Sequence, residues 1–369
     1  MSPRSPRRQS RVNIQSLWVL VLTLGVIFAG SLVRTSFSAE LPSERPPTPC
    51  PECSACWGGI HPDEAGEKFL KGFSIPWEHD IMMRWKRIQR FPPIPKIIHQ
   101  VWIGDLSRAY CSWMDSFRIN FIQENPDWRY KIWTRELYES KYGPMVLGRA
   151  FDRETKVASK ADILRYEVVW REGGIYMDAD SIWLNNSFNF LIGMASATGF
   201  FAVLHDEIPE HLGINHYMNG VFGASKCHPA MEHIVRAMDL LHADMFYEQK
   251  MVFYKRTGPF FFSNALRGFK PAVIDRDIFA PGSWFFEIGN STFEASIAER
   301  MSMMKSAYPD ALTFQIGVNT HNREVGYSCR EWAEALLPQL KAMISSDPPV
   351  SQEALECGDQ DYMTRKWNP

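Results

Sequence analysis

The most constraining feature of this 369-residue chain is a helical pattern that leads, through two glycines, into a short apolar run ending at two aspartates. Residues 157–171 repeat apolar side chains at helical spacing, and Gly173 ends the pattern. The apolar run at 174–177 then leads directly to Asp178 and Asp180. The sequence therefore predicts a helix and a strand, with the acidic pair at the C-terminal end of the strand, where open α/β sheets bind ligands.

The acidic pair has the chemistry of a divalent-cation site. Side chains alternate along a strand, so Asp178 and Asp180 are expected on the same side. Carboxylate oxygens suit Mn²⁺ or Mg²⁺, which take further ligands from water and from substrate phosphates. Such an ion neutralises charge on a departing nucleoside diphosphate. An Asp-x-Asp triplet also occurs in ordinary acidic turns, so the interpretation depends on the residues around it.

The preceding helix carries two residues that suit nucleotide binding. Asp162 and Arg165 are three positions apart and share a face. A carboxylate can accept hydrogen bonds from ribose, and a guanidinium can bind diphosphate oxygens. The alternative is local: Ser159 and Asp162 fit an N-terminal capping box, and Asp162 with Arg165 fits a helix-surface ion pair. Spacing alone leaves both interpretations open.

Further positions along the chain are candidates for the same site. Trp102 ends a predicted strand at 96–102, where its ring can stack on a nucleotide base, worth about 1–3 kcal/mol, or serve as a core residue. Asn219 and the segment 257–259 lie in polar, turn-prone runs that can approach the donor sugar or the acceptor. His321 follows a strand-like apolar run and can complete a metal shell, contact the diphosphate or be structural.

The ends of the chain predict a membrane-anchored domain. Residues 14–33 carry no charge, are long enough to span a bilayer, and follow several arginines, which predicts a cytosolic tail at 1–13 and a retained signal anchor. A cleaved signal peptide is the alternative. A stem containing proline and cysteine is expected at 34–91, a globular domain at 92–345 and a C-terminal tail at 346–369.

Composition and cysteine content set broader bounds. A hydrophobic fraction of 45% and a charged fraction of 22% indicate a folded protein, and a net charge of −2 argues against a nucleic-acid partner. Alternating strands and helices predict an α/β fold with a mixed sheet flanked by helices. Seven cysteines leave at least one unpaired within a monomer. Cys50, Cys53 and Cys56 can bind zinc, but a luminal location favours disulfides.

Three runs of this chain resemble the glycosyltransferases of family 32, whose sugar-binding region contains an Asp-x-Asp motif. The runs are residues 94–102 (IPKIIHQVW), 160–166 (KADILRY) and 173–180 (GGIYMDAD). The resemblance implies a GT-A-like, Rossmann-type mixed sheet and a metal-dependent transfer that retains anomeric configuration.

The resemblance also assigns roles to residues of this chain. Asp178 and Asp180 match the catalytic pair that contacts sugar and metal, and His321 is the candidate for a third metal ligand. The expected donor-binding residues are Trp102, Asp162, Arg165, Tyr176 and Asn219.

The expected function is transfer of a hexose, with mannose as a candidate, from GDP-mannose or a UDP-sugar to a glycan or glycolipid acceptor. The expected cofactor is Mn²⁺ or Mg²⁺. The expected location is the Golgi or endoplasmic reticulum membrane, with the catalytic domain in the lumen. Two alternatives remain: a phosphatase with an aspartyl nucleophile, which normally carries this motif on its first strand, and a non-catalytic, membrane-tethered sugar-binding protein.

Overall fold

A computed structural model describes most of the predicted globular domain. The described residues are 78–88, 90–109, 111–184, 187–205, 216–242, 256–279, 297–315 and 329–346. The predicted tail at 1–13, the anchor at 14–33, the cysteines at 50, 53 and 56, and His321 all lie outside them. Among the helices that are described, none is both long and apolar enough to cross a membrane.

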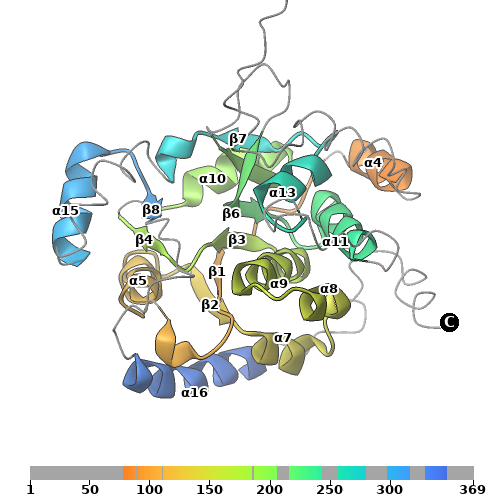
Figure 1. Cartoon of the computed structure of the whole chain (residues 1–369). Coiled ribbons are helices and arrows are strands. Elements are labelled where there is room, and N and C mark those ends of the chain that lie inside the picture. The colour runs from red at the N-terminus through yellow and green to blue at the C-terminus, as the bar shows by residue number, and fades with distance from the viewer. Residues whose placement is uncertain are drawn as a thin grey trace, which may run out of the picture. The chain divides into compact units, whose positions relative to one another are not determined.

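The described domain is built around a six-stranded mixed sheet with the order β2–β1–β3–β6–β5–β7 (Figure 1). β6 is antiparallel to both of its neighbours, and the other neighbouring strands pair in parallel. A second, two-stranded sheet pairs β4 with β8. The strands are β1 (Ile97–Val101), β2 (Arg129–Trp133), β3 (Gly174–Met177), β4 (Ser181–Trp183), β5 (Phe200–Leu204), β6 (Tyr217–Ala224), β7 (Ala272–Ile274) and β8 (Thr313–Gln315).

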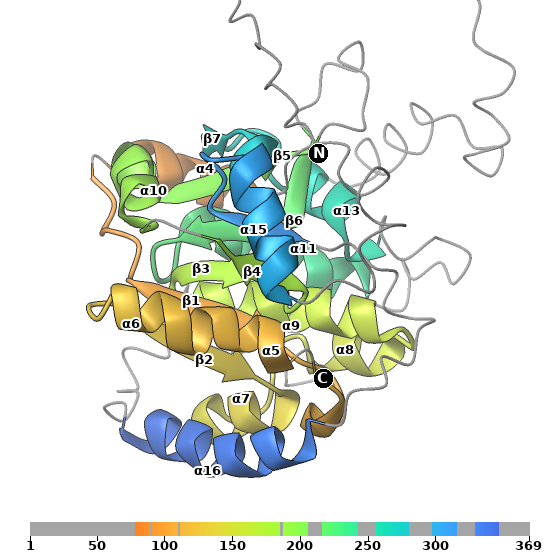
Figure 2. The same cartoon turned by 90° about the vertical axis from the view of Figure 1, so that its left-hand side faces the viewer.

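Helices lie on both sides of the large sheet, which confirms the predicted mixed α/β arrangement. Figure 1 shows α9, α11 and α13 on one side and α5 with the β4–β8 ribbon on the other. Both views place α16 beside α7, near β2 (Figure 2). The helices are α4 (Glu78–Arg87), α5 (Cys111–Asp115), α6 (Ile122–Glu124), α7 (Arg135–Tyr142), α8 (Gly148–Arg153), α9 (Val157–Glu172), α10 (Asn189–Met194), α11 (Pro229–Leu241), α13 (Pro259–Ala265), α15 (Ile297–Ala307) and α16 (Arg330–Ser346), with short helical segments η1 (Leu106–Arg108), η2 (Ser116–Phe121), η3 (Ala195–Ala197) and η5 (Arg276–Ile278).

The turn from α9 into β3 follows the prediction and depends on two glycines. Gly173 ends the helix with a φ of 66°, and Gly174 has a φ of 99°. A Cβ atom at Gly174 would lie 2.8 Å from the Nε2 atom of His99 and from the carbonyl oxygen of Ile97. The close approach lets His99 Nε2 donate to the Gly173 carbonyl at 2.8 Å, while Nδ1 accepts from the indole of Trp133 at 3.0 Å. Glycine is therefore required at 174 by both backbone angle and space.

The β4–β8 ribbon lies at the end of the motif-bearing strand. β4 begins directly after Asp180, and its antiparallel register places Ser181 opposite Gln315. The strand-like run before His321 is confirmed as β8 over residues 313–315. This pairing joins residues 130 or more positions apart in the sequence, and it places Gln315 next to the acidic pair.

A disulfide between Cys111 and Cys329 joins the start of α5 to the residue before α16. The two cysteines are 218 positions apart, so the bridge removes much conformational freedom from the unfolded chain. Cys227 is also disulfide-bonded.

The double variant Cys111→Ala/Cys329→Ala is expected to lower the free energy of unfolding by about 2–5 kcal/mol, because it frees this long loop in the unfolded state. Urea titration of the variant and the wild type measures the difference. Reduction of the wild type is not equivalent, since it also breaks the bond at Cys227. An unchanged urea midpoint would contradict a stabilising role for the bridge.

Candidate active site

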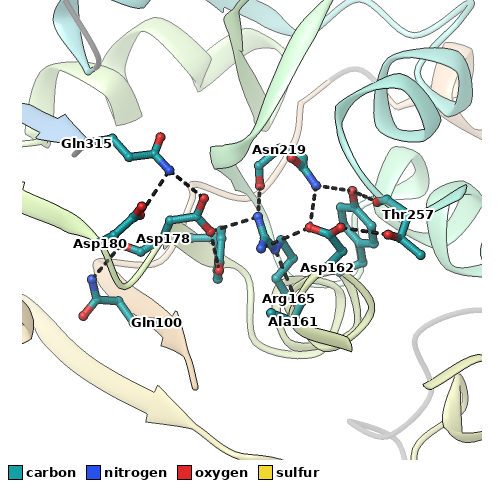
Figure 3. Close-up of polar contacts among 11 residues, drawn as sticks. Gln100, Ala161, Asp162, Arg165, Asp178, Asp180, Asn219, Thr257 and Gln315 are labelled. Carbon is teal, nitrogen blue, oxygen red and sulfur yellow. Dashed lines mark hydrogen bonds and ion pairs between the residues drawn. The ribbon is translucent and has the colours of Figure 1, made fainter. Parts of the chain in front are cut away.

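The backbone of Asp178 is held from both neighbouring strands. Its N–H donates to the carbonyl of Gly220 on β6 at 2.9 Å. Its carbonyl accepts from the side-chain amide of Gln100 on β1 at 3.0 Å. The first aspartate is therefore fixed at the end of β3 by the sheet itself (Figure 3).

The carboxylate of Asp178 has a partner on each oxygen. Oδ1 accepts from the hydroxyl of Tyr176 at 2.8 Å and forms an ion pair with Arg165 at 3.0 Å. Oδ2 accepts from the amide of Gln315 at 2.9 Å. The guanidinium of Arg165 also lies over the ring of Tyr176, 4.5 Å from its centroid. These contacts fix the side chain, which is still 21% exposed and so reaches solvent.

Asp180 shares the amide of Gln315, which donates to its Oδ1 at 3.1 Å. Desolvation raises the pKa of Asp180 to about 7, and the nearby charge of Asp178 adds to the increase. The carboxylates of Asp178 and Asp180 thus share one donor, the side-chain NH₂ group of Gln315. Because this amide is neutral, it does not balance the negative charge of the two carboxylates.

This arrangement fits a hard divalent cation. The converging atoms are carboxylate oxygens, the donor type that Mg²⁺ and Mn²⁺ favour. Space is kept free beside them by Gly220, where a Cβ atom would lie 2.6 Å from Asp178 Oδ2 and 3.5 Å from Gln315 Nε2. Asp178 and Asp180 are the described residues that would hold such an ion. In the described part of the chain, no cluster of three or more histidine, cysteine or acidic side chains forms a metal site.

The side chains of Asp162 and Arg165 on α9 are buried in the protein rather than exposed to solvent, and each residue is 5% exposed. α9 begins after Lys156, and Ser159 lies inside the helix with a buried hydroxyl that has no hydrogen-bond partner. Both local alternatives are therefore wrong. The capping box fails because the helix starts before Ser159. The surface pair fails because both side chains are buried, with Asp162 bonded to Asn219 and Thr257 and Arg165 paired with Asp178.

The buried carboxylate of Asp162 gathers polar groups from three elements. Oδ1 accepts from the amide of Asn219 at 2.8 Å and pairs with Arg165 at 3.1 Å. Oδ2 accepts from the hydroxyl of Thr257 at 2.8 Å. Burial raises the pKa of Asp162 to about 6, against the opposing charge of Arg165. The donor-binding role of Asp162 stays a prediction.

Arg165 connects the two acidic centres. One of its terminal nitrogens pairs with Asp162, and the other donates to the Asn219 carbonyl at 2.7 Å and contacts Asp178 at 3.0 Å. Figure 3 shows this chain of contacts running from Thr257 to Gln315. The structure thus brings together six of the eight predicted site residues: Asp162, Arg165, Tyr176, Asp178, Asp180 and Asn219.

Of the remaining two predicted residues, the structure describes only Trp102. Trp102 directly follows β1, is partly exposed, and donates its indole N–H to the Asp105 carbonyl at 3.0 Å. That position is at the same end of the sheet as the acidic pair, because β1 and β3 are parallel. Stacking on a base stays a prediction. His321 lies outside the described residues, and its role also stays a prediction.

Sequence reasoning missed Gln315 and gave Thr257 no specific partner. The signal for Gln315 was weak: one polar residue in a short apolar strand that pairs far away in the chain. Tyr166 was also missed as a site residue. Its hydroxyl accepts from Asn219 at 3.0 Å and donates to the Thr257 carbonyl at 2.7 Å.

A buried ion cluster holds the residue next to Thr257. Arg256 makes two bonds to Glu154, at 2.9 and 2.8 Å, and His242 lies 3.1 Å from the same carboxylate. Burial alone would raise the pKa of Glu154, but the hydrogen bonds from His242 and Arg256 outweigh it and lower the pKa to about 2. The cluster therefore positions Thr257 against Asp162.

Glu154→Gln is expected to reduce the amount of folding stability that the protein loses when the pH is lowered. The folded-state pKa lies below the ordinary value of 4.5, so this carboxylate contributes stability above pH 4.5 and loses it as pH falls toward 2. Urea midpoints at pH 6 and pH 3 should differ less in Glu154→Gln than in the wild type. The control is Glu139→Gln, which breaks a part-exposed helix pair. An unchanged difference would contradict the assignment.

Gly220→Ala is expected to lower turnover by about 10²-fold, because the added methyl displaces the Asp178 carboxylate by roughly an ångström. Gly193→Ala is the matched control, since its Cβ would meet no atom within 4 Å. Transfer assays and thermal unfolding measure both variants. A Gly220→Ala variant with wild-type turnover would contradict the close contact.

Comparison with known proteins supports the class that the sheet and the paired aspartates indicate. Residues 104–197 match the family described as "Glycosyltransferase sugar-binding region containing DXD motif". The predicted resemblance to the Asp-x-Asp glycosyltransferases is confirmed over these residues.

Three relatives of known class are similar over part of the chain. An "Uncharacterized glycosyltransferase" of Acanthamoeba polyphaga mimivirus is 30% identical, over 41% of this chain and 58% of the relative. "Inositol phosphoceramide mannosyltransferase 3" of Schizosaccharomyces pombe is 30% identical, over 46% and 44%. "Initiation-specific alpha-1,6-mannosyltransferase" of Candida albicans is 24% identical, over 49% and 52%. The chain thus spans about half the length of these relatives.

Proposed function

We propose that this protein is a metal-dependent glycosyltransferase that moves a hexose from a nucleotide sugar to a hydroxyl group of an acceptor. The observation that carries the proposal is the convergence of Asp178 and Asp180 on one N–H donor, with Arg165 paired to the first of them. A Mn²⁺ or Mg²⁺ ion held by the two aspartates would supply the positive charge that a leaving diphosphate needs. The GT-A-like fold and retention of anomeric configuration belong to the same proposal.

The residues around the acidic pair suit the binding of a nucleotide sugar. Arg165 keeps the side chains of Asp162 and Asp178 in fixed positions, and fixed polar groups stabilise developing charge better than mobile ones. Asn219, with its amide on Asp162, lies beside this pair. Trp102 supplies the ring for the base. We propose these roles for donor binding, with His321 as a candidate contact to the metal or the diphosphate.

Mannose is the proposed sugar and GDP-mannose the proposed donor, because two of the relatives are mannosyltransferases by name. The acceptor class that these names suggest is a glycan or a glycolipid. A UDP-sugar is the competing donor, and the assay below distinguishes the two.

We further propose that the protein acts in the lumen of the Golgi or endoplasmic reticulum, tethered by residues 14–33, with 34–91 as stem and 92–345 as the catalytic domain. The disulfide between Cys111 and Cys329 supports this location, because such bonds persist in oxidising compartments.

The phosphatase alternative is disfavoured by the position of the motif, which follows β3 rather than the first strand. The helix before β3 carries Asp162 and Arg165, and Arg165 is paired with Asp178.

The test uses the full-length chain in detergent, with GDP-mannose, UDP-glucose and UDP-galactose, each with and without Mn²⁺. We expect one donor to raise the melting temperature only when Mn²⁺ is present, and to release its diphosphate when an acceptor glycoside is added. Sugar binding without metal-dependent nucleotide binding would instead support the non-catalytic alternative. A phosphate adduct on Asp178 would support the phosphatase.

A further inference from the structure

Gln315 occupies the position that a cation-binding group would take. Its side-chain nitrogen lies 2.9 Å from Asp178 Oδ2 and 3.1 Å from Asp180 Oδ1, so one NH₂ group bridges both carboxylates (Figure 3). No other described side chain is hydrogen-bonded to both members of the pair. The position of Gln315 is fixed by the backbone, because β8 pairs with β4 and places it opposite Ser181.

The carboxamide of glutamine has two different ends on one flat group. The nitrogen donates hydrogen bonds and the oxygen accepts them, and rotation about the terminal torsion exchanges their positions. Facing two carboxylates, the amide must present its nitrogen, since the oxygen would be repelled. Facing a cation held by those carboxylates, the same amide must present its oxygen. Side-chain carbonyl oxygens of Asn and Gln are among the hard oxygen ligands that proteins offer to such ions.

The space around the amide is compatible with this rotation. Gly220 lies beside it without a side chain, and a Cβ atom there would lie 3.5 Å from the Gln315 nitrogen. The two carboxylates that the amide bridges come from the turn between β3 and β4 and are partly exposed. The neighbouring groups therefore leave the amide free to change which end it presents.

We propose that Gln315 is a metal ligand, which turns its carboxamide oxygen toward the cation held by Asp178 and Asp180 and gives the site a third protein oxygen. The proposal rests on the metal-dependent function proposed above. It names a ligand from β8 that the Asp-x-Asp motif does not contain. It also predicts that glutamate, with an oxygen at both ends, serves at position 315.

The test measures Mn²⁺ binding directly, by the loss of the free Mn²⁺ signal in electron paramagnetic resonance, on the full-length chain with and without GDP or UDP. Gln315→Leu removes both polar ends at similar volume and is expected to weaken Mn²⁺ binding by about tenfold or more. Gln315→Glu is expected to bind Mn²⁺ at least as tightly as the wild type. The matched control is Gln123→Leu, the same change at an exposed position on α6.

The outcomes separate this proposal from the proposed function. Wild-type binding of Mn²⁺ together with unchanged or tighter binding by Gln315→Leu would show that the amide only caps the carboxylates, and would overturn this inference alone. Absence of Mn²⁺ binding by the wild type would overturn both. Thermal unfolding checks the fold of each variant. If Gln315→Leu does not fold, Gln315→Glu decides: weaker Mn²⁺ binding than the wild type overturns the proposal.

Discussion

Asp180→Asn is expected to reduce sugar transfer by at least about 10²–10³-fold while leaving the fold intact. The side chain has the same shape but loses the charge that would hold the cation. Its described side-chain partner is the amide of Gln315, so few structural contacts are lost. The change also removes the repulsion between Asp180 and Asp178, so the melting temperature is expected to stay the same or rise.

Measurement of kcat with Mn²⁺ and thermal unfolding together check this result. The control is Asp127→Asn, which alters an exposed pair with Lys96. Asp127→Asn should leave transfer unchanged. Normal turnover by Asp180→Asn in Mn²⁺ would refute the assignment of the acidic pair, and unfolding of that variant would refute the view that Asp180 is functional rather than structural.

Arg165→Met is expected to destabilise the fold by about 3–5 kcal/mol, because it leaves the buried Asp162 and the part-buried Asp178 without their shared cation. It also frees the Asp178 carboxylate to move, so transfer is expected to fall even at temperatures where the variant is folded. Arg165→Lys should retain only part of the stability. It keeps the positive charge, but an ammonium group cannot reproduce the planar two-sided pairing of a guanidinium.

Urea titration and transfer assays at low temperature check both variants. The matched control is Arg118→Met, which breaks a part-exposed pair with Asp115 and should cost about 0–1 kcal/mol. If Arg165→Met and Arg118→Met are equally stable, Arg165 is not the centre of a buried ion cluster.

The segments that could be predicted are those whose signals are local. The helix over 157–171, its end at Gly173 and the strand leading to Asp178 are found where expected, since each depends on side-chain periodicity or on a glycine with positive φ. The mixed sheet with helices on both sides followed from the alternation of such segments. The acidic pair was identified for the same reason, because both aspartates lie in one short run.

The roles of residues on α9 could not be settled locally. The spacing of Ser159, Asp162 and Arg165 fits a capping box and a surface ion pair. The same spacing also fits the buried cluster, so spacing does not distinguish between these interpretations. Burial decides between them, and burial depends on which elements cover the helix. Asn219 contacts Asp162 from β6, and Thr257 contacts it from the segment just before α13. Neither residue is near Asp162 in the sequence.

The sequence by itself determined where the helix and strand meet, that two carboxylates follow the strand, and which class of protein carries such a motif. Only the tertiary structure decided what those carboxylates contact. Gln315 approaches them because β8 pairs with β4, and Arg165 joins them to Asp162 because α9 packs against the sheet. Hydrogen bonds between distant strands depend on the whole fold, and no short stretch of sequence specifies them.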